Sequence, residues 1–280
     1  MNPAIYRAFD RAALNAAYDV CAAVPDSASL LHAYESRSWL LRHQYPRFSE
    51  HCYGERDVQR IDFFSCGKSH APLLVFIHDG YWLLRTKETF SFVANGLITR
   101  GWSVALPGCS PVSKQSLNGI LEELRNAVRW LRKRAFELGS DASHIVVAGW
   151  SAGGHLASLL LDEPGVIGGL SISGIYDLEP FALSDLNATL QLTTTDIEVL
   201  SPLRLPCVDK PFLTACGSQD LSEIRRQMQE FSEYRGSLCQ RDHAQEVDGH
   251  NHFTILRELE SPEGKLTNLL LETFGKQRYL

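Results

Sequence analysis

Residues 149–153 read GWSAG, which fits the pattern G-x-S-x-G. A glycine on each side of Ser151 permits a turn too tight for larger side chains, and such a turn presents the serine hydroxyl for nucleophilic attack. The apolar run His144–Gly149 predicts a strand before the turn, and Ala152 opens a predicted helix after it. This order predicts a catalytic serine, with the backbone N–H of Ala152 facing an oxyanion. The alternative is a Gly-Ser turn without chemistry.

A second segment suited to this chemistry is HDGYW at residues 78–82, which follows the apolar run Leu73–His78. A glycine-containing loop after a strand can present backbone N–H donors to the same oxyanion. We expect these donors at Gly80 and Tyr81. His78 is interpreted as a residue that organises the loop rather than as the catalytic base.

A serine at its free pKa is a poor nucleophile, so it needs a base and an acid that orients the base. With this type of turn, the acid and then the histidine follow the serine along the chain. Asp220 follows the predicted strand Pro211–Cys216 and is the expected acid, although an aspartate there can also cap the next helix. Glu223 is a weaker candidate. His252 is the expected base, with His250 as a neighbour.

Three aromatic residues flank these motifs and are candidates for the walls of a substrate pocket. They are Tyr81, Trp82 and Trp150, and core packing is an equal alternative for the two tryptophans. His250 and His252 could suggest a metal site, but zinc needs at least three protein ligands and the sequence places no third one. We therefore expect no metal.

The elements that must position these residues alternate between strands and helices from residue 60 onward. Strands are predicted at 60–65, 73–78, 102–106, 144–149, 166–173, 211–216 and 244–247, and helices at 117–136, 152–161, 221–234 and 254–259. This alternation predicts an α/β fold with a mostly parallel central sheet, helices on both faces, and chemistry at the carboxyl ends of the strands. Residues 1–50 instead show helical spacing and predict an N-terminal helical arm, which could act as a lid.

Composition narrows the classes of partner. The chain has 280 residues without a linker or repeat, so we expect a single domain over residues 1–280. A net charge of −6 argues against nucleic acid, and no run approaches the ~20 apolar residues of a membrane span. The N-terminus has no apolar core of a signal peptide, and the seven cysteines are scattered, which predicts a cytoplasmic protein acting on a small molecule. A homodimer is left open.

Taken together, the motifs resemble the arylformamidase, or kynurenine formamidase, branch of the α/β-hydrolases. HDGYW at 78–82 is similar to the HGGYW of that branch, and GWSAGGHLA at 149–157 to its GHSAGGHLA. SGIYDLEPF at 173–181, NHF at 251–253 and YDVCAAVPD at 18–26 are similar to further segments of the branch. The resemblance therefore covers nearly the whole chain.

The resemblance implies an α/β-hydrolase fold with the triad Ser151, Asp220 and His252 and no cofactor. The implied reaction is hydrolysis of a small acyl amide of an aromatic amine, such as N-formylkynurenine in tryptophan catabolism. One alternative is an esterase, thioesterase or carbamate hydrolase that acts on another small substrate. A further alternative, from another class, is a ligand-binding protein of the same fold without catalysis.

Four departures from the pattern of the branch predict that the substrate has shifted while the chemistry is retained. Asp79 replaces a loop glycine and adds a carboxylate beside the expected oxyanion site. Trp150 replaces the histidine before the nucleophile, and Cys21 replaces an arginine. PGCSP at 107–111 stands where a Tyr-x-Leu-x-Pro stretch is usual.

Overall fold

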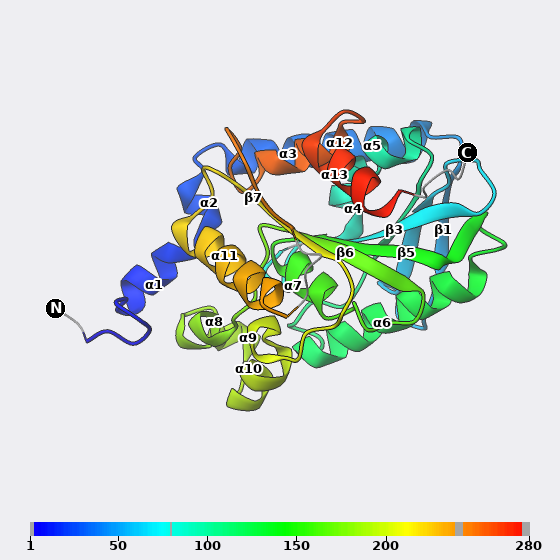
Figure 1. Ribbon diagram of the computed structural model, residues 1–280. Coiled ribbons are helices and arrows are strands. Elements are labelled where there is room, and N and C mark those ends of the chain that lie inside the picture. The colour runs from blue at the N-terminus through cyan, green and yellow to red at the C-terminus, as the bar shows by residue number, and fades with distance from the viewer. Residues whose placement is uncertain (1–2, 79, 239–242, 276–280) are drawn as a thin grey trace.

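The computed structural model describes residues 3–78, 80–238 and 243–275. Within these residues, eight strands form one sheet in the order β1-β2-β4-β3-β5-β6-β7-β8 (Figure 1). The strands are β1 (Phe48–Cys52), β2 (Arg60–Phe64), β3 (Ala71–Ile77), β4 (Ser103–Pro107), β5 (Ser140–Trp150), β6 (Val166–Ile172), β7 (Phe212–Gly217) and β8 (His243–Val247). β2 pairs antiparallel with both β1 and β4, and the strands β4, β3, β5, β6, β7 and β8 run parallel. The predicted α/β fold with a mostly parallel sheet is confirmed.

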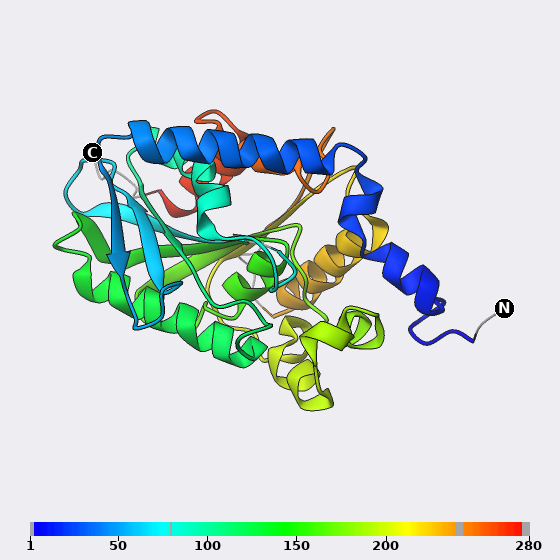
Figure 2. The ribbon, with the colours of Figure 1, turned by 180° about the vertical axis from the view of Figure 1, so that it is seen from behind.

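Helices cover both faces of the sheet, as Figures 1 and 2 show from opposite sides. One face carries α3 (Ser27–Gln44), α4 (Lys87–Phe90), α5 (Ala94–Thr99), α12 (Arg257–Glu260) and α13 (Lys265–Phe274), and the other α6 (Leu117–Arg134), α7 (Ala152–Ser158) and α11 (Ser222–Gly236). Neighbouring residues of β3 therefore enter opposite cores: Leu74 packs into one buried cluster and Val75 into the other. Burial on both sides explains why the central strands are continuous apolar runs.

The start of the chain differs in detail from the predicted arm. The segment 12–23 divides into α1 (Arg11–Ala17) and α2 (Val20–Ala23), because Asp19 accepts the N–H of Ala22 and starts a new helix. Residues 48–52 form the edge strand β1, which begins within the last three residues of the predicted arm. Their half-exposed, mostly polar side chains carry no apolar run that would have predicted a strand.

Three short helices follow β6 and meet the N-terminal helices at the carboxyl edge of the sheet (Figure 1). They are α8 (Glu179–Leu183), α9 (Asn187–Leu190) and α10 (Thr194–Leu200). Asn15 of α1 donates to the Asp185 carboxylate over 2.6 Å, and the Tyr6 hydroxyl donates to Asp177 over 3.1 Å. Two segments about 170 residues apart in the chain therefore lie side by side. Among the helices that the structure describes, none combines the length and apolarity needed to cross a membrane.

Candidate active site

The turn between β5 and α7 holds Ser151 in a backbone conformation that few residues adopt. Its φ is 56° and its ψ is −120°, and its side chain is almost buried. The flanking glycines are sterically required: a Cβ on Gly149 would lie 2.1 Å from the carbonyl oxygen of Gly153, and a Cβ on Gly153 would lie 2.1 Å from that of Ile77. Strain of this kind persists only where the surrounding structure holds it.

Asp220 and His252 come together from the ends of two neighbouring strands. Nδ1 of His252 lies 3.0 Å from Oδ1 and 3.2 Å from Oδ2 of Asp220, and both side chains are buried. A carboxylate at Nδ1 favours the tautomer in which Nε2 accepts a proton. Gly217 at the end of β7 admits the histidine loop, because a Cβ there would lie 2.1 Å from the carbonyl oxygen of His250.

Trp150 connects the serine turn to the histidine loop. Its indole N–H donates to the carbonyl oxygen of His252 over 2.8 Å, and the two rings lie 5.0 Å apart. The Tyr34 hydroxyl of α3 donates to the next carbonyl oxygen, that of Phe253. Trp150 is 2% exposed and packs against Tyr34 and Phe90. The structure therefore gives Trp150 the core-packing position that was the alternative to a pocket wall.

The loop after β3 is a tight turn that lies against α7. The carbonyl oxygen of Gly80 accepts the N–H groups of Leu83 and Leu84 over 2.8 and 2.6 Å. A Cβ on Gly80 would lie 1.7 Å from the Leu84 oxygen, so only glycine fits there. Tyr81 and Trp82 both have positive φ, of 54° and 57°. Asp79, for which the sequence predicts a carboxylate near the oxyanion, lies outside the described residues.

Trp82 joins this loop to the nucleophile helix through His155, which the sequence analysis did not single out. The Trp82 indole N–H donates to Nδ1 of His155 over 3.2 Å, and Nε2 of His155 lies 2.7 Å from the carbonyl oxygen of Leu200. His155 is fully buried, and burial lowers its pKa to about 4. It is therefore neutral near pH 7 and donates from Nε2. Trp82 itself is 7% exposed and belongs to the core.

A partly buried ion cluster holds the far end of the same loop. Nζ of Lys87 lies 2.9 Å from Glu50, 2.6 Å from Asp62 and 2.6 Å from Glu88. Burial alone would lower the pKa of Lys87, but its bonds to these carboxylates outweigh burial and raise it. The same three carboxylates lie close enough together to hold a metal ion, but the Lys87 ammonium already lies among them. The cluster therefore anchors α4 to β1 and β2.

The two weaker candidates have other partners. His250 pairs through Nε2 with Glu258 over 3.0 Å. Glu223 accepts from Arg226 over 2.8 Å and from the Tyr18 hydroxyl over 3.4 Å. Glu223 therefore connects α11 to the N-terminal arm, whereas Asp220 contacts the imidazole of the histidine loop.

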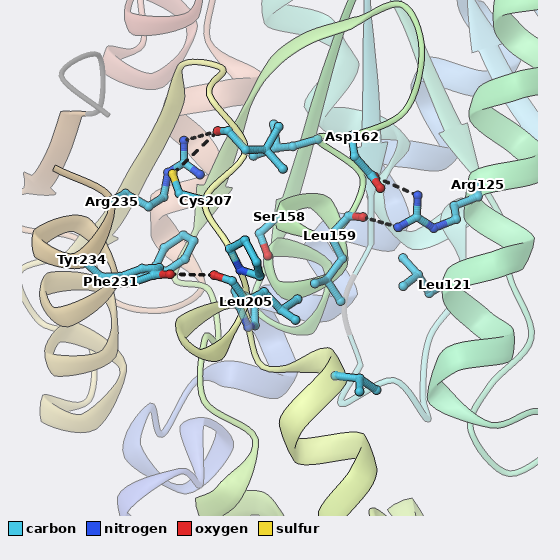
Figure 3. A pocket seen from close by; sticks show the side chains of 15 residues that line it. Leu121, Arg125, Ser158, Leu159, Asp162, Leu205, Cys207, Phe231, Tyr234 and Arg235 are labelled. Carbon is cyan, nitrogen blue, oxygen red and sulfur yellow. Dashed lines mark hydrogen bonds and ion pairs between the residues drawn. The ribbon is translucent and has the colours of Figure 1, made fainter. Parts of the chain in front are cut away.

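Two cavities lie near these elements. One, of about 440 Å³, lies between the N-terminal arm, Tyr81 of the loop after β3, and the α8–α9 segment. The other, of about 230 Å³, is lined by Ser158 at the far end of α7 (Figure 3). In this second cavity the Tyr234 hydroxyl donates to Leu205, and Arg125 donates to Asp162 and Leu159. These contacts join α6 and α11 to the chain between them.

Comparisons with known proteins identify the type of molecule. The BD-FAE family model matches residues 62–162. Kynurenine formamidase of Danio rerio is 28% identical over 240 residues, which is 80% of each chain. Esterase LipC of Mycobacterium tuberculosis is 27% identical over 124 residues, 42% of this chain and 31% of that protein. A solved structure, a putative thioesterase from Silicibacter sp. TM1040, superposes with a TM-score of 0.83 at 25% identity and covers 90% of this chain and 97% of its own. The chain is therefore an α/β-hydrolase that resembles the kynurenine formamidases, an enzyme that hydrolyses amide or ester bonds.

Proposed function

We propose that the protein is a serine hydrolase that cleaves a small formyl-type amide of an aromatic amine, with Ser151, Asp220 and His252 as its catalytic triad. The observation that carries the proposal is the buried contact of Asp220 with Nδ1 of His252, in a loop that Trp150 ties to the serine turn. The likeness to kynurenine formamidase over most of both chains supports the formamide as the substrate class. The cytoplasmic location and a homodimer stay predictions.

The proposed reaction is acyl transfer in two steps. Nε2 of His252 takes the hydroxyl proton as Ser151 attacks the acyl carbon, and Asp220 stabilises the imidazolium that forms. His252 then gives this proton to the leaving amine, which breaks the C–N bond and leaves an acyl-serine. Water, deprotonated by His252, attacks the acyl-serine and releases formate while Ser151 recovers its proton.

Backbone donors are assigned to the oxyanion of both tetrahedral intermediates. They are the N–H groups of Gly80, Tyr81 and Ala152, each of which would lower the barrier by about 3–4 kcal/mol. Support comes from the close approach of the two segments, since a Cβ on Gly153 would lie 2.7 Å from the carbonyl oxygen of His78. The ring of Tyr81 lines the cavity of about 440 Å³ beside this loop. That volume suits a substituted aniline as the leaving group.

An ester or thioester is the second candidate substrate. The likeness to a putative thioesterase over 90% of the chain favours it specifically. The same triad and oxyanion donors serve both reactions, because both pass through a tetrahedral intermediate.

Steady-state kinetics test the proposal. Purified protein is given N-formylkynurenine, formanilide and phenyl acetate, and kcat/KM is compared with that of Ser151→Ala. We expect formamide turnover that falls by about four orders of magnitude or more in the variant. Ester cleavage that depends on Ser151, without formamide turnover, would favour the second candidate. Full activity of Ser151→Ala would overturn the mechanism, and labelling of the native serine by a fluorophosphonate checks its activation independently.

A further inference from the structure

The cavity of about 440 Å³ is lined by Tyr81, whose backbone N–H is one of the proposed oxyanion donors. We assign this cavity to the leaving group of the substrate on that ground. Its walls come from three segments: the N-terminal arm, the loop that follows β3, and α8–α9, which follow β6. Two of these segments leave the carboxyl edge of the parallel sheet, where Ser151 also lies. The Tyr81 hydroxyl donates to the carbonyl oxygen of Tyr18 over 3.1 Å and so joins the loop to the arm.

The charge of this cavity is one-sided. Its described lining includes the carboxylates of Asp19 and Asp185 and contains neither lysine nor arginine. Among the described residues, Arg11 forms an ion pair with Asp185, with 3.7 Å between Nη1 and Oδ1. Counting Arg11 still leaves one excess negative charge. Arg226, on α11 behind the arm, is bound to Glu223 and Glu230.

The remaining lining offers apolar surface and neutral hydrogen-bonding groups. Leu186 and the ring of Tyr18 supply apolar surface, while Asn15 and Thr189 supply neutral polar groups. The Tyr18 hydroxyl accepts from Gln227 over 2.8 Å. Burial raises the pKa of Tyr18, so its hydroxyl stays protonated. A substrate carboxylate in this cavity would therefore meet two carboxylates without a lysine or arginine among the lining residues.

We propose that this cavity selects leaving groups that are neutral or carry an ammonium group, and disfavours those that carry a carboxylate. The inference rests on the proposed function, because it assigns the cavity to the leaving group of the Ser151 reaction. Its substrate class is an aryl formamide or aryl ester whose side chain has an amine and no carboxylate. At a partly solvated site, one repulsive carboxylate is expected to change kcat/KM by about fivefold.

Two matched pairs of substrates isolate this single charge. N-formylkynuramine and N-formylkynurenine differ only in the carboxylate, and so do the phenolic acetate esters of tyramine and tyrosine. We expect kcat/KM to be at least about fivefold higher for the member without the carboxylate, and the ratio to shrink as salt is added. Equal rates within each pair, or a preference for the carboxylate, would overturn the inference.

Two variants and a control test whether the ratio of kcat/KM within each substrate pair depends on the residues that line the cavity. Asp19→Asn keeps a residue type that caps α2 and should reduce the ratio about threefold. Cys21→Arg places a cation in the lining at an exposed position and should reduce or reverse it. Glu137→Gln removes an exposed acid that pairs with Arg134 and should leave the ratio unchanged. A ratio that responds to none of the lining variants would also overturn the inference.

The ester pair separates this inference from the proposed function. If formamides are not hydrolysed but the tyramine ester is cleaved faster than the tyrosine ester, the charge preference holds and the formamide assignment fails. If formamides are hydrolysed with equal rates across each pair, the assignment holds and the charge preference fails.

Discussion

The two walls of the candidate site are built in different ways. On the sheet side, Ser151, Asp220 and His252 are each at most 7% exposed and are held by strand ends and glycine turns. On the arm side, Asp19 and Asp185 are exposed, and contacts between distant parts of the chain hold the wall together. In the proposed mechanism the chemistry would rest on backbone geometry, whereas the proposed choice of substrate would rest on surface side chains that can change at little cost in stability.

The largest effect is expected from the sheet side. Asp220→Asn removes the charge that stabilises the imidazolium and allows the wrong histidine tautomer. We expect kcat to fall by about 10⁴-fold with little change in fold. Asp248→Asn is the matched control, since Asp248 is an exposed neighbour that accepts from Ser218. For both variants, circular dichroism checks the fold and kcat is measured on the best substrate. A fall in kcat of less than tenfold in Asp220→Asn would contradict the role of Asp220.

The glycine turn is tested by adding a single methyl group. Gly153→Ala places a Cβ 2.1 Å from the Ile77 oxygen, so the turn must shift. We expect the free energy of unfolding to fall by about 3 kcal/mol and activity to be lost. Gly236→Ala is the control, because nothing lies within 4 Å of a Cβ there. Urea denaturation measures both; equal stability of the two variants would argue against a rigid sheet-side wall.

His155 predicts how stability depends on pH. Its pKa is about 4 in the folded protein and about 6.5 in the unfolded chain. Between these values the unfolded chain binds the proton, so the free energy of unfolding falls as pH falls, by about 3 kcal/mol over the whole window. Urea denaturation at pH 7.0, 6.0, 5.0 and 4.5 measures how the free energy of unfolding changes with pH. These pH values lie above the range in which Glu88, with a pKa of about 2, is expected to contribute most.

The matched variant for this prediction is His155→Gln, which keeps hydrogen-bonding groups but does not titrate. Its stability should depend less steeply on pH than that of the native protein. The same slope in both proteins would show that another group is responsible.

The smallest effect is expected from the arm side. Asn15→Ala removes the side-chain donor to Asp185 and the acceptor for the Asp185 N–H, at 2.6 and 3.0 Å. Because these bonds are exposed, we expect substrate binding to weaken by about 1 kcal/mol. This would be seen as a several-fold higher KM, with kcat changed less than twofold. Gln229→Ala, which removes an exposed bond to Glu233, is the control. A fall in kcat instead would mean that the arm also positions the chemistry.

The sequence predicts the sheet side far better than the arm side. The apolar runs placed the strands from β2 to β7 to within a few residues of where they lie, because burial on both faces demands such runs. The predicted helix 117–136 is present as α6, and its side chains at helical spacing, Leu121, Leu124, Val128 and Leu131, are buried. The pattern G-x-S-x-G predicted the turn, since its glycines are a steric requirement of that turn.

The rest depends on contacts between distant residues, which no local pattern encodes. The bond from Trp82 to His155 and the cluster around Lys87 join different elements, and neither leaves a periodic signal. Trp150 was open between a pocket wall and the core, and only the tertiary fold shows its bond to the histidine loop. The arm was predicted as helical, but its contact with the segment between α8 and α9 is set by pairs such as Asn15 and Asp185.

The bond from Tyr34 to the carbonyl oxygen of Phe253 joins residues 219 positions apart. On a ribosome that adds about 5–20 residues per second, Tyr34 is made about 10–45 s before its partner. During synthesis α3 therefore exposes apolar side chains that later cover the sheet, until the histidine loop has been made. The nascent chain is thus expected to gain hydrolytic activity only after the histidine loop has been made, and α3 is a segment that a chaperone would have to protect until then.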